Sequence, residues 1–499
     1  MKYCSTRGGS AGVSAAQAVA QGICGDGGLF VPESFPHFSA REIDAMESLN
    51  YRDLAARIME PFLSDFSERE IGACTGGAYT EKKFPGGPAP LAFAGGVHFL
   101  ELWHGPTCAF KDMALQILPR LLALSVQKIQ AGKGAVVLTA TSGDTGKAAL
   151  EGFRDVKGTR VVVFYPKNGV SALQERQMRT QEGNNVFVYA VLGNFDDAQT
   201  GVKRIFADGE IRKKAAEHGW MLSSANSINW GRLLPQITYY FSAWLRLLSA
   251  GEVKPGGAVD FCVPTGNFGD ILAAYYAKKM GLPIGRLICA SNSNDVLTEF
   301  LTTGIYNRNR RFYATISPSM DILVSSNLER LLYDLSGGDG DRVRKWMDEL
   351  ARTGRYRVGG GMLQKIQRLF DAGSCGDSET KDEIRETWER DHYLLDPHTA
   401  VAARVLRRYR EKTGSQTPCV VVSTASPYKF APDVLEAVTG GKRRPDGVFQ
   451  CIRELSDLTG IPVPEPVAAL EGKPVRFSHS CLPAEMGKAV LRSAGWTGA

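Results

Sequence analysis

Short apolar, β-branched runs alternate with helix-like stretches over most of this chain, and this alternation constrains the fold most strongly. The runs are residues 135–140, 160–166, 186–191, 259–264, 286–292 and 418–425. Helix-like segments lie between them, notably residues 228–248 and 269–280. Strands that alternate with helices form βαβ units, whose parallel sheets are covered on both faces. The number of units predicts an α/β fold with two open, mostly parallel sheets flanked by helices.

The first part of the chain has a different, mainly helical pattern. Ser39 and Glu42 have the spacing of a capping box, and apolar residues follow at roughly helical intervals with a break near Asn50. The Pro/Gly-rich stretch at 84–91 then interrupts the chain. We therefore expect an N-terminal domain over 1–93, a small α/β domain over 94–255, and a large α/β domain with a C-terminal extension over 256–499. Residues 330–395 are predicted to be mainly helical, and no pattern assigns an element to the last ~50 residues.

Composition excludes several classes of protein. The 499 residues suffice for a large core in two or three domains. The net charge of +6 comes from scattered basic residues, so nucleic acid is not expected as a partner. The ten cysteines contain no CxxC pair, which predicts reduced, buried thiols and no metal site. With no long apolar window and no secretory signal, we expect a cytoplasmic protein without a membrane partner.

Three loops follow predicted strands, where open α/β sheets bind their ligands. The loop in TATSGDTGKAA (139–149) places small polar groups at a helix start, which suits an anion, although Asp144 or Thr145 in a plain helix cap fits equally well. In PTGNFGDILAAYYAKK (264–279), Gly266 and Gly269 permit close approach to a phosphate. This loop has neither nucleotide-binding glycine pattern. In VVSTASPYKF (421–430), Thr424 offers a hydroxyl to a ligand, or merely ends a strand.

A lysine, Lys111, stands in HGPTCAFKD (104–112), before an apolar stretch. Alone it reads as a surface charge. Combined with the three loops, it completes the set of groups that pyridoxal 5'-phosphate requires: an amine for a Schiff base, a phosphate cradle and a hydroxyl for the pyridine nitrogen. Such an amine must be neutral to react, so burial should lower its pKa. Asp112 is expected to cap the helix that starts here, and Pro119 to kink it.

Several long motifs occur in order along the chain. They are GDGGLFVPE, LELWHGPTCAFKDMALQ, TATSGDTGKAA, YPKNGVSALQERQM, NFDDAQ, SSANSINWGRLLPQ, PTGNFGDILAAYYAKKMGLP and DPHTAVA. On these motifs the chain resembles the threonine synthases, which belong to the tryptophan-synthase-β-like class of pyridoxal phosphate enzymes (fold type II).

The resemblance implies a carbon–oxygen lyase acting on phosphate. Its substrates are O-phospho-L-homoserine and water, and its products, after γ-elimination and β-addition of water, are L-threonine and phosphate, in the last step of threonine biosynthesis. Lys111 matches the Schiff-base lysine and is the candidate base, and Thr424 matches the pyridine-nitrogen hydroxyl. Asp144 stands beside the cofactor where many fold type II enzymes carry Asn. The phosphate loop corresponds to Gly266, Asn267, Phe268, Gly269 and Asp270.

The resemblance also implies two groups of substrate-binding residues. The carboxylate loop corresponds to Ser142, Gly143 and Thr145. The candidates for the substrate phosphate are Lys167, Ser171, Asn226, Ser227, Asn229 and Arg232. A structural alternative stays open for Asn229 as a helix cap and for Arg232 as a surface ion pair. His104 and His398 are expected to be structural, the latter at a helix start lining the cleft, and the chain is expected to act as a monomer or homodimer.

Three rival functions remain. A serine/threonine dehydratase or β-replacement lyase of the same fold has no phosphate on its substrate. A phospholyase acts on another phosphorylated amine. A binding or scaffold protein that keeps the fold needs no cofactor and shows no Schiff-base absorption. Phosphate release and product identity separate the first two from threonine synthesis.

Overall fold

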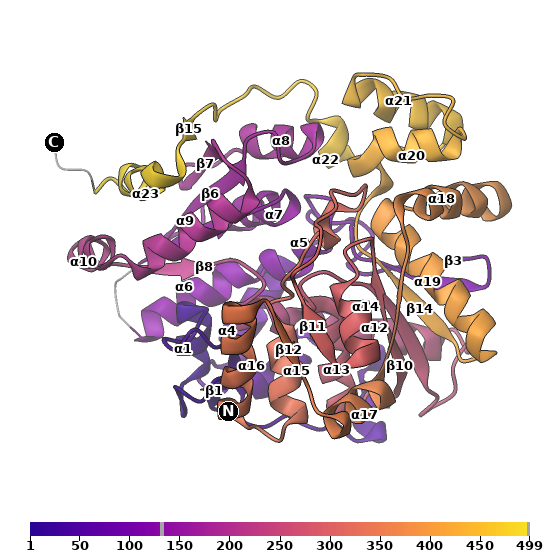
Figure 1. Cartoon of the computed structure of the whole chain (residues 1–499), viewed down its shortest axis with the longest axis horizontal. Helices are drawn as coiled ribbons and strands as arrows, with labels where there is room; N and C mark the ends of the chain where they lie inside the picture. Colours follow the sequence, from indigo (N-terminus) through magenta and orange to yellow (C-terminus); the bar gives the residue numbers. More distant parts are fainter. Residues whose placement is uncertain (130–133, 497–499) are drawn as a thin grey trace.

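Two largely parallel sheets organise the molecule, and the computed structural model describes residues 1–129 and 134–496 (Figure 1). The larger sheet has the order β13-β10-β9-β14-β4-β3, and only β3 runs antiparallel to its neighbour. The smaller sheet has the order β15-β7-β6-β5-β8 with every pair parallel. The predicted fold class is therefore confirmed.

The six predicted runs all form strands of these sheets. The larger sheet contains β3 (Leu91–Ala94), β4 (Val97–Glu101), β9 (Val259–Pro264), β10 (Ile284–Ser291), β13 (Phe370–Ser374) and β14 (Cys419–Ser423). The smaller sheet contains β5 (Gly134–Ala140), β6 (Thr159–Pro166), β7 (Val186–Val191), β8 (Trp220–Ser224) and β15 (Ser480–Cys481). Residues 330–395 are mainly helical, as predicted, and they also contain the edge strand β13, whose short sequence FDAGS has few apolar residues.

Side chains of the smaller sheet alternate between two cores, as parallel strands covered on both faces require. Val137 and Val163 pack on one face together with residues of α6 (Leu118–Ile129) and α7 (Asp144–Phe153). Leu138 and Phe164 pack on the other face with α9 (Phe195–Ala207) and α23 (Met486–Ala494). The sheet is buried from both sides, and this explains its continuous apolar strands.

Helices also cover both faces of the larger sheet. One face meets α12 (Ile237–Ser249) and α13 (Gly269–Lys279), and the other meets α18 (Asp377–Asp391), α19 (Pro397–Thr413) and α20 (Ala431–Val438). Further helices of the two α/β parts are α8 (Ala172–Arg179), α10 (Gly209–Glu217), α11 (Trp230–Leu233), α14 (Val296–Thr303), α15 (Leu328–Leu335), α16 (Gly340–Thr353), α17 (Gly360–Leu369), α21 (Val448–Thr459) and α22 (Glu465–Ala468). A small pair, β11 (Ile305–Asn307) and β12 (Arg355–Arg357), lies outside both sheets.

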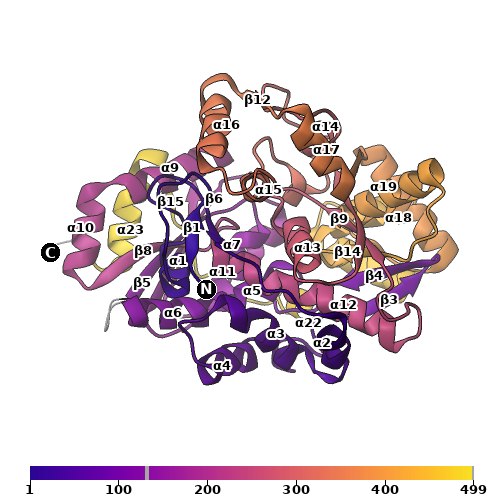
Figure 2. The ribbon, with the colours of Figure 1, turned by 90° about the horizontal axis from the view of Figure 1, so that it is seen from below.

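The N-terminal region is mainly helical, as predicted, and lies along one side of the molecule (Figure 2). Its elements are β1 (Tyr3–Ser5), α1 (Ala15–Gln21), β2 (Phe30–Pro32), α2 (Ala40–Asp44), α3 (Tyr51–Met59) and α4 (Glu68–Ala78). Ser39 and Glu42 form the predicted capping box of α2. The predicted break occurs at Asn50, whose side chain accepts from the Asp53 N–H and caps α3.

The chain ends by returning to the smaller sheet. After α22 it runs past α8, adds β15 to the edge of β7 and packs α23 on α9 (Figure 1). The domain boundaries at residues 93 and 255 stay a prediction. The two sheets do not follow them, because β4 of the predicted small domain lies in the larger sheet and β15 of the predicted large domain lies in the smaller one.

Two further observations concern the whole chain. The ten cysteines, all within the described ranges, are buried and unpaired, as predicted. None of the helices that the structure describes combines the length and the apolar character needed to cross a membrane.

Candidate active site

The lysine predicted to be reactive, Lys111, is the first residue of α5 (Lys111–Leu115), which lies between the two sheets (Figure 1). The Phe110 N–H donates to the Thr424 carbonyl at 2.8 Å, so the end of β14 lies beside the lysine. Helix α5 ends at Leu115 and α6 begins at Leu118, which places Pro119 in a new first turn. In place of one helix kinked by Pro119, the structure thus has two helices, with Pro119 near the start of the second.

The expected role of Asp112 as a helix cap is wrong. Its carboxylate accepts from the Thr107 N–H and the Thr107 hydroxyl, both at 2.8 Å, and holds the turn that precedes α5. Asp112 lies inside the helix because Phe110 already has helical angles and occupies the cap position without a side-chain bond. Burial raises the pKa of Asp112 to about 6.

The Lys111 amine is buried among polar groups. Its side chain is 11% exposed, and Nζ lies 3.3 Å from Asp144 Oδ2 and 3.1 Å from Ser319 Oγ. Burial lowers the Lys111 pKa, as the sequence predicts, while Asp144 opposes this shift and Lys429 and Arg232 add to it. The site thus favours the neutral amine that a Schiff base requires.

Asp144 begins α7 and joins two lysines. Its Oδ1 accepts from Lys429 Nζ at 2.7 Å and from Gln174 Nε2 at 3.0 Å, while Oδ2 faces Lys111. The plain-cap alternative for Asp144 is wrong, because Gly143 is the cap residue and no side-chain cap bond exists. Burial raises the pKa of Asp144, but Lys429 and then Lys111 outweigh it and hold the pKa far below its usual range.

The loop around Asp144 is tightly built. Gly143 has a φ of 139°, and a Cβ there would overlap the side chain of Gln174. A larger residue would therefore displace the amide that binds Asp144. Ser142 and Thr145 are half-buried neighbours in the same loop.

The loop predicted to bind phosphate leads from β9 into α13. The first turn of α13 has no side-chain cap, so its N–H donors are available. Phe268 has the left-handed conformation, with φ of 61°, and its ring is buried against Phe370. A Cβ on Gly266 would come within 2.7 Å of the Ser319 carbonyl, so only glycine admits Ser319 this close to Lys111.

Asp270 lies behind this loop and not on its surface. Its Oδ1 accepts hydrogen bonds from the hydroxyls of Tyr239 at 2.5 Å and Tyr240 at 2.6 Å, both on α12. Burial raises the pKa of Asp270 to about 6. The Asp270 carboxylate is therefore directed to α12, whereas the backbone N–H groups at the start of α13 remain suited to an anion.

Residues 319–327 join the loops but were missed by the sequence prediction. Ser325 Oγ donates to the Gly266 carbonyl at 2.8 Å, and Asn327 Nδ2 donates to the Asn267 carbonyl at 2.9 Å. Ser326 Oγ lies 3.3 Å from Asn267 Oδ1 and 3.5 Å from Ser227 Oγ. This segment thereby brings the phosphate loop next to the predicted substrate residues.

Arg232 is a buried cation in this region. It is 3% exposed, and Nη1 donates to the Ala225 carbonyl at 2.8 Å. The ion-pair alternative is wrong, because no carboxylate pairs with Arg232 among the described residues and its Nε has no partner there. Burial lowers its pKa to about 10. Nearby, Asn226 Oδ1 is buried and also lacks a partner within the described ranges.

Three other predicted substrate residues lie in different surroundings: Asn229, Ser171 and Lys167. Asn229 caps α11, and its amide donates to the carbonyls of Val19 and Ser224, which bears out its structural alternative. Because Asn229 is fully buried, its engaged amide is not offered to a ligand. Ser171 caps α8 in a capping box, and Lys167 is exposed in the turn before it.

The end of β14 and the start of α19 complete the site. Thr424 is 6% exposed, whereas Ser423 Oγ is taken up by Trp103 Nε1 at 3.0 Å and Thr399 Oγ1 at 3.1 Å. His398 Nε2 accepts from the Ser319 N–H at 3.1 Å, and its Nδ1 lies 2.8 Å from Asp396. His398 thus holds Ser319 in place, while His104 contacts Glu101 at 2.7 Å.

Three site residues were missed for different reasons. Lys429 follows a buried strand inside the apolar SPYKF stretch, and a lysine in such a context is a usable signal. Gln174 is hidden because its capping-box spacing with Ser171 already explains it. Ser319 stands in the short 3-10 turn Pro318–Met320, which no sequence pattern connects to the site, so only long-range contacts place it.

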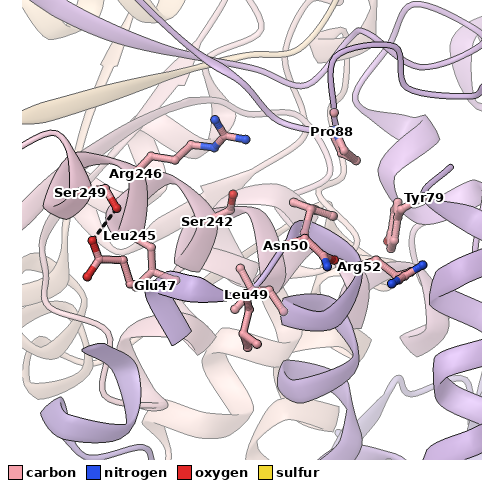
Figure 3. Close-up of a pocket in the computed structure, with 13 residues that line it drawn as sticks. Glu47, Leu49, Asn50, Arg52, Tyr79, Pro88, Ser242, Leu245, Arg246 and Ser249 are labelled. Atoms are coloured by element: carbon pink, nitrogen blue, oxygen red, sulfur yellow. Dashed lines mark hydrogen bonds between the residues drawn. The ribbon is translucent and has the colours of Figure 1, made fainter. Parts of the chain in front are cut away.

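A cavity of about 540 Å³ lies elsewhere, between the start of α3 and α12 (Figure 3). Its lining includes Asn50, Arg52, Tyr79 and Arg246, and Glu47 binds Ser249 at 2.6 Å on its rim. None of the predicted site residues lines it. Its chemistry is therefore separate from that of Lys111.

Three families match successive parts of the chain. "Threonine synthase N terminus" matches residues 2–79, "Pyridoxal-phosphate dependent enzyme" 86–425, and "Threonine synthase, C-terminal" 399–481. The crystal structure of pyridoxal phosphate-bound threonine synthase from Brucella melitensis superposes with a TM-score of 0.87 at 36% identity over 99% of both chains.

Sequence relatives agree. The chain is 41% identical over 445 residues to threonine synthase from Pseudomonas aeruginosa, covering 88% of this chain and 91% of that protein. It is 42% identical over 433 residues to Threonine synthase-like 1 from Homo sapiens, covering 85% of this chain but only 58% of that longer protein. The chain belongs to the threonine synthase family of pyridoxal phosphate-dependent enzymes.

Proposed function

We propose that this chain converts O-phospho-L-homoserine and water to L-threonine and phosphate. The observation that carries this proposal is the presence of two separate anion-binding features near one buried lysine. The uncapped start of α13 suits the cofactor phosphate, and Arg232, buried without a carboxylate partner among the described residues, suits a second one. The cofactor phosphate would bind at the first feature, and a substrate that carries its own phosphate would bind at the second.

The residues present fit the cofactor. Lys111 offers its amine, residues 266–269 offer backbone donors, and Gly266 admits the Ser319 backbone close to Lys111. Thr424 has a hydroxyl for the pyridine nitrogen, and Asp144 lies beside the reactive amine. When bound, pyridoxal phosphate draws electrons from the substrate carbons and makes their protons removable.

The chain's own groups then move protons and orient the substrate. Lys111 Nζ is the base at the substrate Cα, and it returns protons at neighbouring carbons. The half-buried Ser142 and Thr145, with the Gly143 backbone, suit the substrate carboxylate. Arg232, Asn226 and Ser227 suit its phosphate, and the exposed Lys167 stays a further candidate.

The rival functions make less use of these residues. A dehydratase acting on serine or threonine has no need for Arg232, because its substrate carries no phosphate. A phospholyase for another phosphorylated amine does use such a cation. The residues of the site therefore do not distinguish a phospholyase from a threonine synthase, whereas the identity of the product does.

The test is a phosphate-release assay with O-phospho-L-homoserine, together with chromatographic identification of threonine. The wild-type chain is expected to release one phosphate per threonine, and Lys111→Ala is expected to lose both turnover and the visible absorption of the bound cofactor. Turnover of serine or threonine without phosphate release contradicts the proposal, and a different product from a phosphorylated amine favours the phospholyase.

Arg232→Gln tests the second phosphate site separately. We expect KM for O-phospho-L-homoserine to rise by about tenfold or more, since a buried charge-assisted contact is lost, while cofactor absorption stays. Arg246→Gln, an exposed arginine on α12, is the matched control and should leave KM unchanged.

A further inference from the structure

Lys429 is a second lysine in the cluster around Lys111. It lies in the 3-10 turn Pro427–Phe430 after β14 and is 1% exposed. Its Nζ is 2.7 Å from Asp144 Oδ1 and donates to the Thr107 carbonyl at 2.9 Å. Lys429 therefore touches the Asp144 carboxylate and the turn that leads into α5.

The two oxygens of Asp144 have different surroundings. Oδ1 is held by Lys429 and Gln174, while Oδ2 faces Lys111 Nζ and, at 3.3 Å, Ser319 Oγ. A buried carboxylate needs a counter-ion, because removal from water disfavours its charge. Lys111 cannot serve permanently, since its nitrogen must lose its proton to react. Lys429 has no such duty and keeps its contact throughout.

We propose that Lys429 is a positioning residue for Lys111: it fixes the ionised Asp144 through Oδ1, so that Oδ2 remains an acceptor that orients the Lys111 nitrogen as this nitrogen loses and regains its proton. The inference rests on the proposed role of Lys111 as the cofactor lysine. Asp144 and Lys429 together carry no net charge, so the buried carboxylate is compensated without a proton on Lys111.

The charges around Lys111 make the proposal testable. The charged or titratable groups that act on its amine are Asp144 on α7, Lys429 after β14, Arg232 on α11 and Asp270 on α13. Lys429 repels a proton on Lys111, and Asp144 attracts it. Removing Lys429 and removing Asp144 must therefore shift the Lys111 pKa in opposite directions, whereas a mere loss of packing admits water and raises it in both variants.

The experiment measures the Lys111 pKa in the full-length chain after removal of cofactor with hydroxylamine. Circular dichroism and thermal unfolding against the holoenzyme establish that each protein is folded. Trace acetic anhydride labels amines between about pH 6 and pH 11, and mass spectrometry quantifies the Lys111 peptide at each pH. This readout is independent of turnover, so a failed assay with O-phospho-L-homoserine leaves it intact.

Lys429→Met is expected to raise the Lys111 pKa by about one unit, and Asp144→Asn to lower it by a similar amount. The double variant should lie between them, and Lys429→Arg should stay near wild type because it keeps the charge. Lys147→Met is the matched control: Lys147 is another buried lysine, paired with Glu151 at 3.3 Å and also bonded to Gln181, and its removal should leave the Lys111 pKa unchanged.

An unchanged Lys111 pKa in Lys429→Met, or shifts of the same sign in the two single variants, overturns the proposal. Lys429→Met leaves the Asp144 carboxylate buried without its lysine and could fail to fold for this reason. In that case the Lys111 pKa of Asp144→Asn is compared with that of the double variant, because neither of them contains this carboxylate. In this comparison too, the proposal requires a higher Lys111 pKa in the variant that lacks Lys429, and an unchanged pKa overturns it.

Discussion

At the scale of single residues, two buried carboxylates near Lys111 are held in different states by their neighbours. Asp144 contacts two lysines, which hold its pKa well below the usual range despite burial. Asp270 contacts two tyrosine hydroxyls, and burial raises its pKa to about 6. Asp144 thus stays ionised beside Lys111, whereas Asp270 gains a proton at mildly acidic pH.

Asp270 makes stability depend on pH. Its native pKa of about 6 exceeds the reference value of 3.8, so the folded state binds more protons between these values. This contribution is fully present below about pH 4 and is lost as the pH rises through about 6, which lowers the free energy of unfolding by at most about 3 kcal/mol. We expect Asp270→Asn to abolish this part of the dependence.

The measurement is the urea midpoint of wild type and Asp270→Asn across this pH window. Their difference isolates Asp270 from Asp112, whose pKa is also raised to about 6. A difference that stays constant with pH contradicts the expectation.

At the scale of elements, α5 owes its position to a close contact with α7. A Cβ on Gly152 of α7 would overlap the carbonyl oxygen of Leu115, the last residue of α5. The backbones of the two helices therefore meet directly. This contact fixes the end of the short helix whose first residue is Lys111.

Gly152→Ala is expected to destabilise the chain by about 2–3 kcal/mol, because a backbone carbonyl cannot move aside as a flexible side chain does. Gly72→Ala is the control, since nothing lies within 4 Å of a Cβ built there in α4, and alanine should stabilise that helix by about 0.5–1 kcal/mol. Urea unfolding measures both. Equal effects of the two substitutions disagree with the proposed contact.

At the scale of the whole molecule, the C-terminal segment closes the smaller sheet and supports the active site. Arg176 on α8 donates to the carbonyls of Leu470 and Glu471, and Arg179 donates to that of Phe477. Helix α8 also carries Gln174 to Asp144. Residues 470–477 therefore hold a helix that contacts the Lys111 cluster.

Met486→Ala tests this closure. Met486 is 1% exposed at the start of α23 and packs against Gly201 of α9. Its truncation leaves a cavity in the core of the smaller sheet and should cost about 2–5 kcal/mol of unfolding free energy. The exposed Lys488→Ala, in the same helix, should change it by less than about 0.5 kcal/mol. Thermal unfolding followed by circular dichroism measures both, and matching midpoints are inconsistent with this packing.

Three features follow from the amino-acid sequence alone: the two parallel sheets, the position of Lys111 at a helix start and the two glycine-containing loops. These features depend on local pattern: apolar runs of strand length, Gly/Pro punctuation and motifs of consecutive residues. The same local signals located the capping box at Ser39 and the break at Asn50. Edge strand β13 escaped because it has little apolar pattern.

Which polar groups meet depends on the folded arrangement of distant segments. Lys429 lies 318 positions after Lys111 in the numbering, yet both bind Asp144. Asn229 and Arg232 share one motif, but one is used as a cap and the other keeps a buried guanidinium without a carboxylate partner in the described ranges. Such outcomes depend on burial and on contacts between distant segments, and neither is encoded in the spacing of neighbouring residues.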